Sequence, residues 1–421
     1  MKHTKILSIL LCLLILTSIS SLTAFAAPKA DFNVGSDSAV LMDLTTGQIL
    51  YSKNPDKQQS PAGLVKVAAA LHMLDKAQDT ENGIDAYISV SEKTVNSLIG
   101  TNVIGLVAGE GLTLREALYG MLLQSANDCA VAAAETMSGS TDKFISEMNE
   151  KLKSLGCKNT NFSNVTGLYS KDNYTTASDV ALIMKNASED PNFVEIAGTT
   201  TYNLAQTNKM GSRTFYSRCP LLSSYEYALA GAGGYTDEGR YTMAVTASNN
   251  NLRLVAVVMN AQDEKTRNDD LKNLLDYGFE NYQSILLAPE ELNIPDAKLM
   301  GAMGKIGVVT FDLDNPVSVL APIEAVADEL EFQPQKTSYK KKDDMSGVFT
   351  VLYNGTKITE LNLTGTPKKK FTFYSFIKTV LLILLALIVL VALLVVYYIW
   401  DDNQKKKKRR QLREKRRANL Q

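Results

Sequence analysis

Two long apolar runs lie near opposite ends of the chain, and different residues surround them. The first run, over residues 6–19, follows Lys2 and Lys5 and precedes small residues at 24–27. A short apolar core between a basic start and small residues is typical of a secretory signal peptide, so we expect residues 1–27 to be removed. An uncleaved anchor helix is the alternative, and the shortness of the run disfavours it.

The second run, over residues 379–400, is apolar on every side of a helix. Its roughly 22 residues, at about 1.5 Å rise each, suffice to cross a hydrocarbon core of about 30 Å. Ten Lys and Arg residues follow between Lys405 and Arg417, which predicts that the tail 401–421 stays in the cytoplasm. We therefore expect a single-span protein whose residues 28–378 lie outside the cytoplasmic membrane.

Strand patterns occur on both sides of a helical region. Residues 38–54 alternate around a turn and predict a β-hairpin, and residues 241–247 and 252–259 predict two more strands joined by an Asn-rich turn. A helical pattern follows at 264–282. Strands that are distant in sequence but belong to one sheet fit a single α/β domain over residues 28–285.

The middle of the chain carries start signals for several helices. Thr113 followed by Glu116 is a capping box, and Ser140 or Thr141, and then Thr176, precede further helical stretches. These signals predict an α-rich lobe inserted between the strands.

After Pro289 the pattern changes to short β-rich runs, such as 306–310 and 348–353. Runs of this length with turn residues between them predict a small all-β domain over residues 286–366. A basic segment, residues 367–378, is predicted to link this domain to the membrane helix.

The distribution of charge narrows the choice of partners. Between Pro28 and Pro367 there are 28 basic and 42 acidic residues, a formal net charge of −14. Such an acidic ectodomain argues against nucleic acid as a partner, and against simple adsorption to anionic wall polymers. The basic tail is instead expected to lie on anionic lipid of the inner leaflet.

The few histidines and cysteines exclude several chemistries. His72 is the only histidine besides His3 in the predicted signal peptide, so we expect neither a histidine-based metal site nor Ser-His-Asp catalysis. Cys129, Cys157 and Cys219 remain after the signal, an odd number without a disulfide framework. No metal and no cofactor are expected.

Three short blocks carry candidate chemistry. Residues 60–66 read SPAGLVK, residues 123–128 read LQSAND, and residues 230–238 read AGAGGYTDE. In this order and spacing they resemble the low-molecular-mass penicillin-binding proteins, specifically the serine D-alanyl-D-alanine carboxypeptidases. The resemblance implies a penicillin-binding/β-lactamase-like domain, an antiparallel sheet plus a helical lobe, in a protein of peptidoglycan metabolism at the bacterial cell membrane.

The first block departs from the family at its nucleophile. The family has Ser-x-x-Lys at the start of a helix, where three-residue spacing puts the amine beside the hydroxyl that it activates. This chain keeps Lys66 but has Gly63 at the serine position. Ser60 lies three positions too early to replace the missing hydroxyl.

The second block retains the family's Ser-x-Asn element as Ser125 and Asn127. The resemblance implies that this serine assists proton transfer and that this asparagine binds substrate and lysine. On local grounds alone, Ser125 would instead cap a helix over 127–137.

The third block aligns with the family's Lys-Thr-Gly strand, whose lysine and threonine hold the terminal carboxylate of the substrate. Ala232 and Gly233 stand at those two positions, followed by Gly234 and, two residues later, Thr236. The resemblance therefore implies a degenerate substrate-binding strand.

These losses affect two different steps, acylation and carboxylate binding, and predict a catalytically inactive homologue that binds a peptidoglycan stem peptide or a cell-wall synthesis protein. One alternative is a residual carboxypeptidase that uses Ser125 with Lys66, or a water activated by Lys66. Another is a membrane-tethered structural or sensor protein. If the scaffold is intact, the combined variant Gly63→Ser, Ala232→Lys and Gly233→Thr is expected to recover some acylation.

Overall fold

The computed structural model describes residues 30–249, 251–289, 292–301, 304–340, 343–369 and 373–418. The predicted signal peptide, residues 1–27, lies outside the described residues. The chain divides into two compact units. The first unit contains the described residues up to Leu287 together with Val317–Leu330 and Tyr353–Thr359, and the second contains the remaining described residues.

The first unit is organised by a five-stranded antiparallel sheet in the order β2-β1-β9-β8-β7. Its strands are β1 (Ser38–Asp43), β2 (Ile49–Lys53), β7 (Ala228–Thr236), β8 (Arg240–Ser248) and β9 (Arg253–Ala261). The predicted hairpin and the predicted later strand pair are both confirmed. Because β1 pairs with β9 along the whole length of β1, the two ends of the domain sequence meet in the middle of the sheet.

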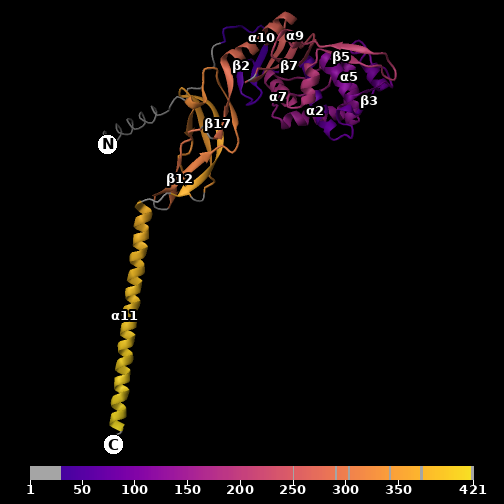
Figure 1. Ribbon diagram of the computed structural model, residues 1–421. Coiled ribbons are helices and arrows are strands. Elements are labelled where there is room, and N and C mark those ends of the chain that lie inside the picture. The colour runs from indigo at the N-terminus through magenta and orange to yellow at the C-terminus, as the bar shows by residue number, and fades with distance from the viewer. Residues whose placement is uncertain are drawn as a thin grey trace, which may run out of the picture. The chain divides into compact units, whose positions relative to one another are not determined.

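Both faces of this sheet are buried at its centre, so β9 is apolar without interruption from Leu254 to Met259. In β9, Val255 and Val257 pack into a core shared with the helical lobe, whereas Ala256 and Val258 pack into a core shared with α10 (Glu264–Asn281). Figure 1 shows α10 apart from α2 (Val65–Gln78) and α5 (Asn127–Ser138), as this alternation requires.

A helical lobe is inserted between β2 and β7, as predicted. Its helices are α2 (Val65–Gln78), α3 (Glu92–Ser97), α4 (Leu114–Leu123), α5 (Asn127–Ser138), α6 (Thr141–Ser154), α7 (Ala177–Ala187), α8 (Pro191–Gly198) and α9 (Leu221–Ser224), with the 3-10 helix η1 (Ala62–Leu64) before α2. The capping box of Thr113 and Glu116 is confirmed, and Ser140 and Thr176 cap α6 and α7 with their side chains.

Short antiparallel pairs complete the first unit. They are β3 (Tyr87–Ser89) with β4 (Gly111–Thr113), β5 (Thr201–Leu204) with β6 (Arg213–Tyr216), and β10 (Tyr282–Leu287) with β13 (Val317–Pro322).

The second unit contains a six-stranded sheet in the order β14-β16-β17-β12-β11-β15. Its strands are β11 (Ala297–Gly301), β12 (Gly304–Asp312), β14 (Glu331–Pro334), β15 (Ser338–Lys340), β16 (Ser346–Tyr353) and β17 (Thr356–Lys369). The predicted runs 306–310 and 348–353 lie in β12 and β16. Since β17 ends at Lys369 and the last helix begins at Phe373, both overlap the predicted linker 367–378.

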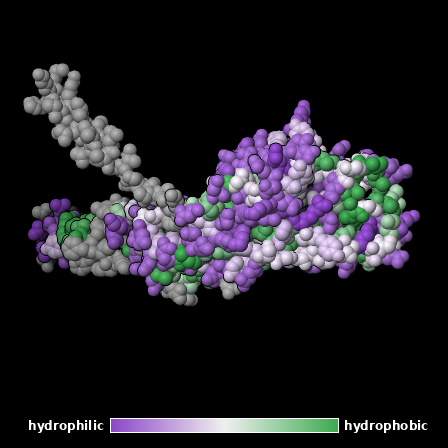
Figure 2. Space-filling view, turned by 90° about the horizontal axis from the view of Figure 1, so that it is seen from above, coloured by the Kyte–Doolittle hydropathy of each residue, from purple (hydrophilic) through white to green (hydrophobic). Residues whose placement is uncertain are grey.

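The last helix, α11 (Phe373–Ala418), contains the only stretch of the described chain that is long and apolar enough to cross a membrane, Ile377–Arg413. Its apolar side chains are exposed, and the predicted span 379–400 lies within it. These properties fit a membrane anchor. By contrast, most of the remaining surface turned to the viewer in Figure 2 is hydrophilic.

A buried carboxylate on α10 holds the beginning of the domain against this helix. Asp270 accepts hydrogen bonds from the backbone nitrogens of Gly35 (2.9 Å) and Ser36 (2.7 Å), and from the Ser36 hydroxyl (2.6 Å). Its side chain is almost fully buried. Removing the carboxylate therefore leaves buried donors without an acceptor, which is more costly than losing an exposed bond.

We predict that Asp270→Ala lowers the free energy of unfolding by about 2–4 kcal/mol. The neighbouring Asp269 is exposed and pairs only with Lys265 one turn away, so Asp269→Ala is the matched control and should change stability by at most about 0.5 kcal/mol. Denaturant unfolding of both variants measures the difference. Equal losses would show that the Asp270 contacts do not stabilise the domain.

Candidate functional site

Five of the predicted site positions line one cavity of about 310 Å³ at the amino-terminal end of α2. The lining comprises these five positions and residues from four further loops and strand ends: Gly63, Lys66, Gly100, Thr101, Asn102, Ser125, Asn127, Thr166, Leu168, Tyr169, Arg218, Tyr235, Thr236, Asp237 and Glu238. The cavity is within the size range of small-ligand sites. Ala232, Gly233 and Gly234 are not among its lining residues.

The chain enters the site through a strained turn. Ala62 has φ of 44°, which is uncommon for a residue with a side chain, and η1 begins there. A Cβ atom on Gly167 would lie 1.8 Å from the carbonyl oxygen of Ala62, so only glycine permits the loop after Thr166 to pack against this turn. Strain of this kind persists where the surrounding structure enforces it, and is typical of functional sites.

Gly63 lies directly against the backbone of β7. A Cβ atom built on Gly63 would lie 2.3 Å from the carbonyl oxygen of Gly233 and 2.6 Å from the backbone nitrogen of Gly234. No side chain fits at position 63 unless one of these backbone segments moves. The space that a side chain at position 63 would need is therefore filled by main chain.

The predicted carboxylate-binding positions also differ from expectation. Ala232 is 3% exposed and belongs to the core shared with the helical lobe. Gly233 faces the other way, and its Cβ would lie 2.2 Å from the carbonyl oxygen of Thr242 on β8. The recovery of acylation by Gly63→Ser, Ala232→Lys and Gly233→Thr together stays a prediction, and it requires backbone movement, because a Cβ at Gly63 or Gly233 meets backbone atoms.

Gly234 and Thr236, the other two predicted positions of the third block, lie in different surroundings. Gly234 packs against the turn, since its own Cβ would lie 2.9 Å from the Cα of Gly63. Thr236 does line the cavity, and its hydroxyl accepts a hydrogen bond from the backbone nitrogen of Gly239 at 3.0 Å. Of the predicted strand, only its end thus reaches the cavity.

The interpretation of Ser125 as a helix cap is wrong. The residue at the cap position of α5 is Ala126, which makes no side-chain cap, and Ser125 has φ of 53°. Asn102 supports this conformation through two hydrogen bonds. Its side-chain nitrogen donates to the Ser125 carbonyl oxygen at 2.8 Å, and its backbone carbonyl oxygen accepts from the Asn127 backbone nitrogen at 2.8 Å. Within the described chain, neither the Ser125 hydroxyl nor the Asn127 side chain has a hydrogen-bond partner.

Lys66 is 2% exposed, and its amine donates to the carbonyl oxygen of Thr166 at 2.5 Å. Burial and, next, the positive charge of Arg218 together lower the pKa of this amine to about 7. A lysine with this pKa is partly neutral at neutral pH, so it can accept a proton.

Sequence reasoning missed several lining residues. Arg218 donates to the Asn102 side-chain oxygen at 2.9 Å, and no local pattern marked either residue. Asp237 and Glu238 are the last two residues of the third block, so their place in that motif was a usable signal. Thr166 contributes a backbone carbonyl, which has no signature in the sequence.

The geometry can be compared with known proteins. The sequence model of the D-alanyl-D-alanine carboxypeptidase family matches residues 23–263, more than half of the chain. The chain belongs to this family. The predicted resemblance is therefore confirmed.

Sequence similarity to known carboxypeptidases extends beyond the first unit. D-alanyl-D-alanine carboxypeptidase DacF of Bacillus subtilis is 29% identical over 350 residues, covering 82% of this chain and 88% of the relative. DacC of Escherichia coli is 27% identical over 359 residues, covering 80% and 86%.

Solved structures agree with the fold. Penicillin-binding protein 5 from Haemophilus influenzae matches with a TM-score of 0.70 and 22% identity, covering 80% of this chain and 98% of that one. The carboxypeptidase DacD from Francisella tularensis matches with a TM-score of 0.67 and 20% identity, covering 82% and 96%. The predicted penicillin-binding-type fold is thereby confirmed.

The packing of Gly63 predicts that even one added methyl group destabilises this family member. We expect Gly63→Ala to lower the free energy of unfolding by about 1–3 kcal/mol, since the methyl group overlaps the backbone of β7. Gly211→Ala is the matched control, because a Cβ at Gly211 meets nothing within 4 Å. Denaturant unfolding measures both, and an equal effect of the two changes would contradict the close contact.

The lowered pKa of Lys66 predicts a pH-dependent stability. An unfolded lysine keeps its proton up to a pH near 10.5, whereas the folded site releases it near 7, so the unfolded chain binds more protons between these values. The contribution of Lys66 to stability should therefore rise with pH across this window, by at most about 1.4 kcal/mol per pH unit.

The measurement compares wild type with Lys66→Met by denaturant unfolding at pH 7, 8 and 9. The stability difference, wild type minus variant, should increase with pH. Lys93→Met, at an exposed lysine, is the control and should show no such trend. A constant difference for Lys66→Met would show that its amine titrates as an ordinary lysine.

Proposed function

We propose that this protein is a catalytically inactive, membrane-anchored member of the D-alanyl-D-alanine carboxypeptidase family that binds peptidoglycan stem peptides or a cell-wall synthesis protein. The observation that carries the proposal is the contact at Gly63, where the backbone of Gly233 and Gly234 occupies the space of a nucleophile's side chain. Without that side chain, no acyl-enzyme bond can form at this position.

The energetic consequence of this loss is large. Removing the nucleophile of another serine hydrolase costs on the order of a millionfold in turnover. The second loss adds to the first, because Ala232 lies in the core and Gly233 faces β8, so neither supplies a cation or hydroxyl to a substrate carboxylate.

A retained cavity supports a binding role. Its interior keeps a buried amine at Lys66, a guanidinium at Arg218, and the unpartnered polar groups of Ser125 and Asn127. Polar groups held in fixed positions recognise a ligand without needing to react with it.

We infer the orientation of the chain from its charges. The basic residues that follow the apolar part of α11 favour a cytoplasmic C-terminus, which puts both compact units outside the cytoplasmic membrane. In this arrangement the cavity faces the compartment that contains the cell wall.

A residual enzyme is the second candidate, and one observation favours it. The Ser125 hydroxyl lies in the same cavity as a lysine amine whose pKa is about 7, so a base is available to a serine or to a water. A membrane-tethered structural or sensor protein, without a wall ligand, is the third candidate.

We predict that the full chain in detergent neither forms a covalent adduct with a fluorescent penicillin nor releases D-alanine from a pentapeptide ending in D-Ala-D-Ala. Gel fluorescence and an alanine assay measure these outcomes, with an active carboxypeptidase of the family as the positive control. Stoichiometric label or alanine release would refute inactivity. If Ser125→Ala then abolished it, the second candidate would hold.

Titration calorimetry with the same pentapeptide separates the remaining candidates. A saturable heat that Asn127→Ala weakens would support peptide binding in the cavity. Absence of heat would favour a protein partner or a purely structural role.

A further inference from the structure

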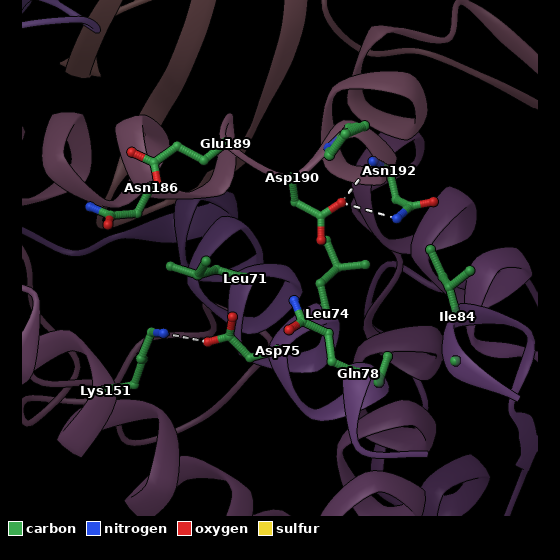
Figure 3. A pocket seen from close by; sticks show the side chains of 13 residues that line it. Leu71, Leu74, Asp75, Gln78, Ile84, Lys151, Asn186, Glu189, Asp190 and Asn192 are labelled. Atoms are coloured by element: carbon green, nitrogen blue, oxygen red, sulfur yellow. Dashed lines mark hydrogen bonds and ion pairs between the residues drawn. The ribbon is translucent and has the colours of Figure 1, made fainter. Parts of the chain in front are cut away.

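A second cavity, of about 530 Å³, lies in the helical lobe at the carboxyl-terminal end of α2. It shares no lining residue with the cavity around Lys66. Side chains of α2, α6 and α7 and the beginning of α8 surround it (Figure 3). Its volume suits a ligand of small-molecule or side-chain size.

The floor of this second cavity is aliphatic. Leu71 and Leu74 lie one turn apart on α2, and Figure 3 shows their side chains in the middle of the cavity, with Ile84 to one side. Pro191, the first residue of α8, extends this apolar surface. The lining contains no aromatic side chain, so a flexible methylene chain fits it better than a ring that needs a stacking partner.

The polar rim contains acceptor oxygens that have no donor in the described chain. The side-chain nitrogen of Asn186 donates to the carbonyl oxygen of Leu182 at 2.8 Å, and that of Asn192 donates to Asp190 at 3.0 Å. These bonds leave both amide oxygens without a donor in the described chain. Asp190 uses one carboxylate oxygen for the backbone nitrogen and the side chain of Asn192, and its other oxygen has no described partner.

The charges of the lining also favour a cation. Asp75 is already neutralised by Lys151, with 2.6 Å between the charged atoms, and Glu189 lies 3.7 Å from Lys185. Asp190 has no cation within ion-pair distance in the described chain, so it is the carboxylate available to a ligand. Figure 3 shows Asp190 on the opposite side of the leucine floor from the Lys151–Asp75 pair.

We propose that this second cavity binds an aliphatic primary amine, with the ammonium group at Asp190 and the methylene chain over Leu71 and Leu74. An ammonium group carries a positive charge and hydrogen-bond donors, which match the carboxylate oxygen of Asp190 that has no partner in the described chain. The chemistry is that of a lysine side chain in a peptide, or of a free alkyl diamine.

The test titrates the full chain in detergent with three probes by calorimetry. They are Nα-acetyl-lysine methylamide, cadaverine, and Nα-acetyl-norleucine methylamide, which lacks the ammonium group. We expect saturable binding of at least one amine and no binding of the norleucine probe, and weaker binding at higher ionic strength. Binding of the lysine probe alone would identify a peptide side chain as the ligand, and binding of cadaverine alone would identify a free diamine.

Asp190→Asn is the decisive variant, because asparagine also caps a helix and the change mainly removes the charge. It should weaken binding of the amine about three- to fivefold. Asp237→Asn, in the cavity around Lys66, is the matched control and should leave binding unchanged. The proposal is overturned if no amine binds, if the norleucine probe binds equally, or if Asp237→Asn rather than Asp190→Asn weakens binding.

Discussion

The contact between the backbone of β7 and the turn before α2 determines the state of the family site in this protein. It exists because Gly63 and Gly234 have no side chains, and Gly233 packs equally closely against β8 on the other face. In close-packed interiors even one methyl group must be accommodated by movement elsewhere. The three glycines therefore act together. Gly63 and Gly234 let the turn and β7 approach each other, and Gly233 lets β7 approach β8, and a side chain at any of the three positions would overlap backbone atoms.

Around this contact the chain keeps features that are energetically unfavourable in a folded protein. Ala62 and Ser125 keep backbone conformations that are unfavourable for residues with side chains, and Lys66 remains buried beside a single backbone acceptor. Such features are maintained only where neighbouring structure enforces them. Here Asn102 and the loop at Gly167 do so. Polar groups held in fixed positions in this way are suited to recognising a ligand.

Helix α2 connects the two cavities of the helical lobe. Its first turn carries Lys66 into the family site, while Leu71, Leu74 and Asp75 on its later turns line the second cavity. The two cavities differ in chemistry. The first contains the buried amine of Lys66 and the exposed guanidinium of Arg218, and the second contains the Asp190 carboxylate, which has no cation in the described chain, over an aliphatic floor. A ligand that binds one therefore has little reason to bind the other.

Local patterns in the sequence determined the secondary structure, the capping residues Thr113, Ser140 and Thr176, the apolar span in α11 and the family, because these depend on residues close together in the chain. The absent serine at Gly63 was equally visible. Only the tertiary structure decided that β7 fills the empty space, that Ala232 faces the core, and that Ser125 does not cap α5. Only the tertiary structure placed Arg218 and Asn102 in the cavity around Lys66 and revealed the second cavity. These features arise where segments far apart in sequence pack together, and no local pattern records the distance between two backbones.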